Sequence, residues 1–352
     1  MAKRSNPVEI AETDRLEGFA HPRETARLVG QDEALARAAR AIRGGRPPQA
    51  WLITGPPGIG KATLAYRIAR YLLAFGATDK GPDDLSVPSG DAASIQVAAG
   101  SHPGLLVLKR GINPKTGKLM TVTSVDEVRR LRAFFGMTSA AGGWRVTIVD
   151  TADDLHDESA NALLKLLEEP PSRAMLLLVA HVPGRLLPTI RSRCQRLDLR
   201  PLDNATVETA LKSLVPDLDA RERASVVRLS GGSIGMALQL ASGEGVMLAQ
   251  EADALIDGAA APDIPALLVF ADKVNRITDG LDSFGAFLTQ ALMDRIRARA
   301  STDSAGLGRW VEAWEKLERN FARTSALYLD PRQTLLSGAR ILGDAARRAG
   351  TL

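Results

Sequence analysis

The stretch from Gly55 to Thr63 (GPPGIGKAT) has the residue types and the spacing of a phosphate-binding loop. Gly55, Gly60 and Lys61 match the pattern Gly-x-x-x-x-Gly-Lys, in which backbone N–H groups and a lysine bind the phosphates of a nucleotide. A glycine turn without a ligand is the alternative, and the combined strand, spacing and lysine disfavour it. The candidate nucleotide-binding residues here are Gly55, Pro56, Pro57, Gly58, Ile59, Gly60, Lys61, Ala62 and Thr63.

The position after the lysine departs from this pattern. A serine or threonine hydroxyl normally stands there and binds Mg²⁺, whereas this chain has Ala62. Thr63 follows one residue later and is rotated by about 100° around the helix, so it is a poor substitute. We therefore expect ATP to bind weakly or not at all, and no ATP or metal to be required.

An acid at the end of a second apolar run belongs to the same candidate site. Val146–Val149 is followed by Asp150, and an acid at this place in a nucleotide-binding sheet can hold Mg²⁺ or its water. The next residue in an ATPase of this type is commonly a glutamate that polarises the attacking water, but here it is Thr151. Asp153 and Asp154 are interpreted as a solvated turn.

Strands and helices must alternate along the chain to bring these residues together. Apolar runs predict strands at 51–54, 105–108, 146–149 and 175–180. Helices are predicted at 32–42, after Lys61, from a capping box at 124–127 to Phe135, and from about Ser159 to Glu169. This alternation predicts a parallel sheet with its ligands at the carboxyl ends of the strands. His181 follows one such end and is interpreted as a hydrogen-bonded structural histidine, with a weak phosphate sensor as the alternative.

Composition and charge exclude several classes of protein. A chain of 352 residues suggests two or three domains, and its net charge of +4 is too small to demonstrate nucleic-acid binding. The single cysteine, Cys194, excludes an internal disulfide and a multi-thiolate zinc site. No apolar run is long enough for a membrane span or a signal peptide, so we expect a cytoplasmic protein without membrane contact. Residues 76–100 lack a clear period and are interpreted as an irregular insertion.

Three stretches together resemble the clamp-loader branch of the AAA+ ATPases. They are AWLITGPPGIGKAT at 50–63, NALLKLLEEPP at 161–171 and the triplet Ser192-Arg193-Cys194, and the resemblance is good over residues 25–245. It implies a role in DNA replication within the DNA polymerase III holoenzyme. The implied partners are gamma/tau-type and delta-type subunits in a hetero-oligomeric ring, which meets primed DNA and the sliding clamp through the complex.

The resemblance gives Arg193 a role in another chain. In clamp loaders the arginine of this triplet projects into the nucleotide site of the neighbouring subunit, so Arg193 would be an arginine finger acting in trans. A planar and permanently charged guanidinium suits this role because it stabilises charge on a transferring phosphoryl group. A surface arginine paired with a carboxylate is the alternative interpretation.

Two other features of the family are altered in this chain. Active relatives carry an arginine for their own γ-phosphate where this chain has Gly235, and glycine offers no side chain for that contact. Gly235 is interpreted as a close-packing or capping residue at the start of a helix. Relatives often carry a four-cysteine zinc module before a Gly-x-His-Pro sequence, which stands here at 100–103, but residues 88–99 include no cysteine. We therefore expect no zinc, and with Ala62 and Thr151 we expect no intrinsic ATPase activity.

These observations predict an α/β P-loop (AAA+) domain with a parallel sheet, followed by two helical domains. The expected boundaries are 1–198 for the P-loop domain, 199–244 for a small helical lid, and 245–352 for an all-α collar that by resemblance joins subunits into a ring. One collar helix is expected to bury the face formed by Val311, Trp314, Leu317 and Phe321.

Three functions are consistent with this sequence. The first is a clamp-loader subunit that does not hydrolyse ATP but supplies Arg193 to a neighbour and helps to hold the ring open. The second is an active ATPase motor that uses Lys61 and Asp150, with Thr63 or Asp153 compensating. The third is a DNA-binding module that uses the scattered arginines. The intact triplet beside an incomplete catalytic set favours the first.

Overall fold

The chain folds into two compact units. The computed structural model describes residues 16, 18–109, 130–131, 133–135, 143–155, 157–242, 244–277, 280–300, 306–327 and 329–349. The first unit extends to Arg200 but excludes Pro57–Ile59, which belong to the second unit together with the chain from Pro201 onward. The lid and the collar expected from the sequence lie together in this second unit, so the boundary at residue 244 stays a prediction.

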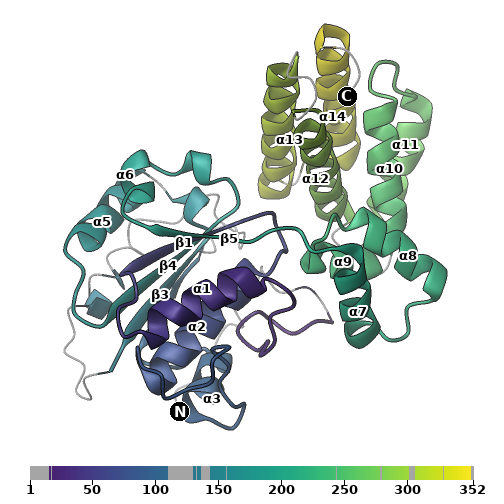
Figure 1. Cartoon of the computed structure of the whole chain (residues 1–352). Helices are drawn as coiled ribbons and strands as arrows, with labels where there is room; N and C mark the ends of the chain where they lie inside the picture. Colours follow the sequence, from purple (N-terminus) through teal and green to yellow (C-terminus); the bar gives the residue numbers. More distant parts are fainter. Residues whose placement is uncertain are drawn as a thin grey trace, which may run out of the picture. The chain divides into compact units, whose positions relative to one another are not determined.

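The first unit is built on a parallel sheet of five strands in the order β2-β3-β4-β1-β5 (Figure 1). The strands are β1 (Ala50–Thr54), β2 (Leu105–Leu108), β3 (Arg145–Asp150), β4 (Ala174–Ala180) and β5 (Gln195–Asp198). The parallel α/β fold and its four expected strands are confirmed. The sequence did not reveal β5, because only Leu197 of its four residues is buried and the strand has no apolar run.

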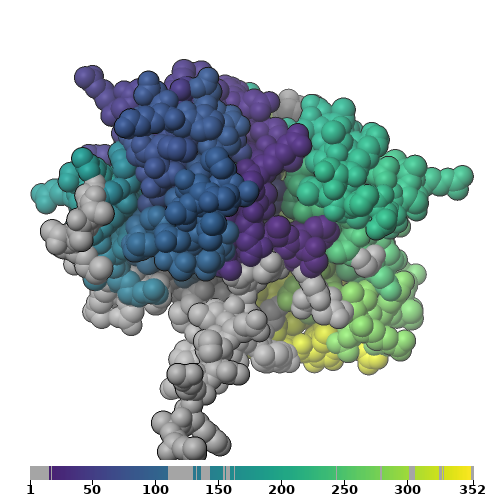
Figure 2. All heavy atoms as spheres, turned by 90° about the horizontal axis from the view of Figure 1, so that it is seen from below, coloured from purple at the N-terminus to yellow at the C-terminus, as the bar shows by residue number. Residues whose placement is uncertain are grey.

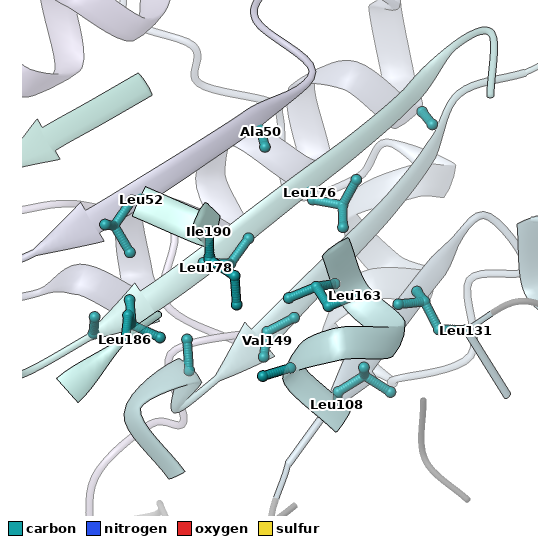
Figure 3. Packing of buried hydrophobic residues seen from close by; sticks show 14 of the residues in the cluster. Ala50, Leu52, Leu108, Leu131, Val149, Leu163, Leu176, Leu178, Leu186 and Ile190 are labelled. Carbon is teal, nitrogen blue, oxygen red and sulfur yellow. The ribbon is translucent and has the colours of Figure 1, made fainter. Parts of the chain in front are cut away.

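Helices cover both faces of this sheet, as Figure 1 shows. They are α1 (Asp32–Arg43), α2 (Lys61–Phe75), α5 (Asp157–Glu168) and α6 (Pro188–Arg191), whereas α3 (Ala92–Ala98) packs on α2. Leu163 of α5 and Ile190 of α6 are buried in one cluster with Leu52 of β1 and Leu176 and Leu178 of β4 (Figure 3). This cluster fixes α5 and α6 on one face of the sheet.

The same cluster includes part of the helix expected near residue 130. Leu131 and Phe135 are both buried in it, as their spacing predicted. The capping box at 124–127 lies outside the described residues.

Two buried arginines on α2 hold the chain that precedes and follows this helix. Arg67 donates to the carbonyl oxygen of Ala26 and pairs with the Asp84 carboxylate at 2.7 Å. Arg70 donates to the carbonyl oxygens of Arg23 and Thr25. These bonds supply partners for two buried charges and anchor the helix that follows the phosphate-binding loop.

The insertion at 76–100 is more ordered than its sequence indicated. It contains helix α3, whose first turn is capped by Asp91, because this carboxylate accepts the backbone N–H of Ala93 at 2.8 Å. The interpretation of the whole segment as irregular was therefore wrong, since seven helical residues are too few to display a clear period. In Figure 2 the segment forms part of the blue surface of the first unit.

The second unit is helical throughout its described elements. These are α7 (Asn204–Leu214), α8 (Ala220–Leu229), α9 (Ile234–Ala241), α10 (Gly245–Asp257), α11 (Ile264–Val274), α12 (Gly280–Ala300), α13 (Leu307–Leu327) and α14 (Pro331–Ala349). Phe284 of α12 contacts Phe270 of α11 and Phe321 of α13, with ring centroids 4.9 and 6.2 Å away. These aromatic contacts join three helices through one buried side chain.

The expected buried face of α13 is correct except for one residue. Trp314, Leu317 and Phe321 are buried, but Val311 is 39% exposed. Trp310 takes the buried position instead, because residues 310 and 311 both lie one turn before Trp314 and the larger side chain faces the core. Among the described residues no helix has both the length and the apolar character that crossing a bilayer requires.

Candidate functional site

The carboxyl edge of the sheet brings together the residues of the predicted nucleotide site. The phosphate-binding loop follows β1, Asp150 ends β3, and His181 follows β4. The register pairs Asp150 with Val179 of β4, and Val179 in turn pairs with Ile53 of β1. Asp150 is therefore level with the end of β1, as the predicted parallel sheet required.

Lys61 is turned onto its own loop. Its ammonium group donates to the carbonyl oxygens of Gly55 at 2.7 Å and Pro56 at 2.6 Å, and the residue is only 4% exposed. Burial lowers the pKa of Lys61 from 10.5 to about 8, although the charges of Asp150 and Asp153 act in the opposite direction. The charge that would bind phosphates is thus buried and bonded to neutral oxygens of the same loop.

The shifted lysine makes stability depend on pH in a defined way. Because the pKa of Lys61 is about 8 in the folded chain and 10.5 in its ordinary state, the folded chain releases the proton first as the pH rises. The free energy of unfolding should therefore rise by about 3 kcal/mol from this group alone between pH 8 and pH 10.5. Chemical denaturation at several pH values should show that rise in the wild-type chain relative to Lys61→Met, and parallel pH profiles would contradict it.

Asp153 does not lie in a solvated turn, and that interpretation of the sequence was wrong. Its side chain is 5% exposed, and its Oδ2 accepts the backbone N–H groups of His181 at 2.7 Å and Val182 at 3.2 Å. Burial acts to raise the pKa of Asp153, but these hydrogen bonds and the nearby His181 ring lower it below its ordinary value. Asp153 is an anchor for the chain after β4, and the side chain of Asp154 is outside the described residues.

His181 has the hydrogen-bonded structural role that its sequence position predicts. Its Nδ1 lies 3.5 Å from the Asp153 Oδ2 that also accepts its backbone N–H. Asp153 and His181 therefore tie the short helix after β3 to the end of β4.

The tip of the phosphate-binding loop packs directly on the start of α9 within the second unit. The backbone N–H of Gly235 donates to the carbonyl oxygen of Gly58 at 2.8 Å, and the Ser233 hydroxyl donates to that of Pro57 at 2.9 Å. A Cβ on Gly235 would lie 2.6 Å from the Gly58 Cα, which is a distance that real Cβ atoms do not adopt. Gly235 therefore permits a backbone-to-backbone contact, and this confirms the close-packing glycine expected at the start of the helix.

A metal ion finds few ligands around these residues. Ala62 contributes no hydroxyl, and the described residues contain no group of three histidine, cysteine or acidic side chains placed to hold a metal. Burial raises the pKa of the Cys194 thiol to about 12, so the thiolate that zinc requires is disfavoured. The described residues thus offer no thiolate cluster for zinc, and the position after Lys61 lacks the hydroxyl that binds Mg²⁺ in a P-loop.

Arg193 lies at the surface of the first unit, away from the buried core. It is held by a 2.8 Å ion pair from Nη2 to Glu168 Oε1, and Nη1 donates to the carbonyl oxygen of Thr189 at 3.0 Å. The side chain remains 37% exposed. The structure of the single chain thus contains the carboxylate pairing that was the alternative interpretation, in a position that leaves the guanidinium accessible.

Three residues of this arrangement were not identified from the sequence. Glu168 stands within the quoted NALLKLLEEPP motif, but nothing in that motif signals its pairing with Arg193. Ser233 has the sequence signal of a helix N-cap and accepts the Met236 N–H, yet its bond to the loop joins residues 176 positions apart. Asp198, which accepts a hydrogen bond from the Thr54 hydroxyl, lies on the strand that was missed.

Comparisons with known proteins agree on one family. A family model described as DNA polymerase III, delta subunit, matches residues 30–203. The chain is 38% identical over 207 residues to DNA polymerase III subunit delta′ of Pseudomonas aeruginosa, which covers 58% of this chain and 59% of that protein. It is 35% identical over 204 residues to the Escherichia coli subunit delta′, with 58% of each chain covered.

A longer match reaches into the helical part. DNA polymerase III subunit tau of Salmonella typhimurium is 29% identical over 349 residues, covering 91% of this chain and 51% of that protein. The chain spans less than two thirds of the length of each of these relatives. Residues 30–203, with the P-loop, the parallel sheet and the Ser-Arg-Cys triplet, match the DNA polymerase III subunits of the clamp-loader family of AAA+ proteins.

Proposed function

We propose that the chain acts in DNA replication as a delta′-type subunit of a clamp loader that does not hydrolyse ATP itself. It supplies Arg193 to the nucleotide site of an adjacent gamma/tau-type subunit, in a cytoplasmic ring that also holds a delta-type subunit. Primed DNA and the sliding clamp are met through that complex. The observation that carries the proposal is an accessible Arg193 in an intact triplet, in a chain whose own phosphate-binding lysine is buried.

The state of the chain's own loop supports this division of roles. Lys61 is bonded to Gly55 and Pro56, and the positions that would hold Mg²⁺, activate water and contact the γ-phosphate are Ala62, Thr151 and Gly235. Gly55 to Thr63 with Asp150 therefore form a degenerate nucleotide site. Charge stabilisation of a transferring phosphoryl group needs several such groups at once, and the remaining ones are too few.

An ATPase assay on the purified chain separates this proposal from an active motor. We expect no turnover above background for the chain alone at saturating ATP and Mg²⁺, and ATP hydrolysis once the cognate gamma/tau-type and delta-type subunits are added. Turnover by the isolated chain comparable with that of an active AAA+ subunit would reject the proposal. The buried anchoring role of Asp153 argues against its compensating for a missing catalytic group.

Replacing the loop lysine should leave the function intact. We expect Lys61→Ala to assemble into the complex and to support clamp loading at the wild-type rate, because no nucleotide needs to bind at Gly55–Thr63. Loading assays on primed DNA provide the measurement. A loading defect in a correctly assembled Lys61→Ala complex would mean that nucleotide in this loop matters.

A further inference from the structure

The backbone at Arg193 is fixed by buried residues on either side of it. Ile190 is fully buried, and Cys194 packs against the same apolar cluster, which lies between α6 and the sheet (Figure 3). The backbone N–H of Arg193 donates to the Ile190 carbonyl oxygen at 3.1 Å, and that of Ser192 donates to Pro188 at 3.0 Å. The backbone conformation at Arg193 is therefore fixed, and its side chain leaves the backbone in one direction.

Two acceptors then hold the guanidinium itself. Thr189 contributes its carbonyl oxygen to Nη1, and Glu168 contributes Oε1 to Nη2. An arginine has five N–H donors in one plane, so these two bonds fix the plane and leave three donors. Among the described residues no further partner of those three is found.

The stability of the fold does not explain why Glu168 stands where it does. It is the last residue of α5, and a negative charge at a helix C-terminus is disfavoured by the helix dipole. The ion pair is exposed, with Glu168 at 50% and Arg193 at 37%, and pairs of this kind contribute little to folding. What the pair does is restrain a long side chain that would otherwise sample many rotamers.

Glu168 and Arg193 are also carried by one rigid layer. Leu163 lies on the same helix as Glu168, and Ile190 lies three residues before Arg193. Both apolar side chains are buried in the cluster that packs α5 and α6 on the sheet. Their relative placement is therefore set by the apolar core beneath them.

We propose that Glu168 is a positioning residue for Arg193. Together with the Thr189 carbonyl, it holds the guanidinium in one plane, so that the remaining N–H groups form a ready donor set for the phosphates of a nucleotide bound to the neighbouring subunit. Pre-organised donors stabilise developing charge better than mobile ones, because they need no reorganisation when the charge appears. This inference rests on the proposed trans role of Arg193 and adds to it the residue that orients the finger.

The test compares Glu168→Ala with Glu168→Gln in the complete reconstituted clamp loader. Glu168→Gln keeps an oxygen acceptor for Nη2, whereas Glu168→Ala removes it. We expect the single-turnover rate constant for ATP hydrolysis at the neighbouring site to fall by about tenfold in Glu168→Ala and to recover most of its value in Glu168→Gln. The ATP concentration that gives the half-maximal rate should be the same in both variants as in the wild type. Glu169→Ala is the matched control, because Glu169 is exposed and adjacent, and it should hydrolyse ATP at the wild-type rate.

Each outcome decides the inference separately from the proposed function. A rate loss in Arg193→Ala together with a wild-type rate in Glu168→Ala would overturn the inference alone, and so would equal losses in Glu168→Ala and Glu168→Gln. A higher rate in Glu168→Ala would also overturn it, since Glu168 would then be restraining the finger away from its target. A wild-type rate in Arg193→Ala would reject the trans role itself. Gel filtration of each complex verifies that the variants fold and assemble.

Discussion

Replacing Arg193 by alanine should reduce ATP hydrolysis at the one neighbouring site that it serves by about 10³-fold, while the complex still assembles. The size of the effect follows from removing a permanent positive charge from the position where negative charge develops on the transferring phosphoryl group. Assembly should persist because Arg193 is exposed and its ion pair with Glu168 contributes little to folding.

The measurement is single-turnover hydrolysis by the reconstituted complex, since steady-state rates would be diluted by the other active sites. Arg191→Ala is the matched control, because Arg191 is exposed, ends α6 and stands two residues before Arg193. Each active site contributes one kinetic phase to the single-turnover trace. The Arg191→Ala complex should retain all of these phases, and the Arg193→Ala complex should lose one. Identical traces for wild type and Arg193→Ala would contradict the proposed trans role.

Introducing a methyl group at Gly235 should destabilise the second unit by about 1–3 kcal/mol, the usual range for an added group that a packed site cannot accommodate. The new Cβ would lie 2.6 Å from the Gly58 Cα and 3.1 Å from the Gly58 carbonyl oxygen. Backbone atoms cannot rotate away as a side chain can, so the loop tip and α9 must separate. Their two hydrogen bonds, Gly235 to Gly58 and Ser233 to Pro57, would then be lost.

Gly308→Ala provides the control for this prediction. Gly308 is the second residue of α13, as Gly235 is of α9, and a Cβ placed there meets no atom within 4 Å. Alanine in a helix is favoured over glycine by up to about 1 kcal/mol, so the midpoint of thermal unfolding should rise slightly in Gly308→Ala and fall in Gly235→Ala. Equal shifts in the two variants would show that the backbone contact at Gly235 is not tight.

Local patterns were sufficient to predict much of the first unit. The apolar runs that became β1, β3 and β4 are continuous because both faces of a parallel sheet are covered, and this makes such strands visible in a sequence. The spacing of Leu131 and Phe135 likewise placed both on a buried helix face. The short edge strand β5 lacked that signal, since it buries Leu197 alone.

Errors arose where partners distant in sequence decide the environment of a residue. Asp153 resembles a turn residue until the backbone N–H groups of His181 and Val182 are brought to its carboxylate by the neighbouring strand. Gly235 is the close-packing glycine at a helix start that the sequence predicted, but its partner Gly58 lies far away in the sequence, so no local pattern identifies it. Glu168 belongs to the same category, because its pairing with Arg193 depends on how α5 and α6 pack on the sheet.

The measurement that tests the central claim most directly is the effect of Arg193→Ala in two altered complexes. In one, the P-loop lysine of the neighbouring ATPase subunit is replaced by alanine; in the other, Lys61 of this chain is replaced. If Arg193 serves the neighbour, adding Arg193→Ala should change nothing in the first complex and should remove one phase of ATP hydrolysis in the second. A further loss in the first complex, or no loss in the second, would contradict the account.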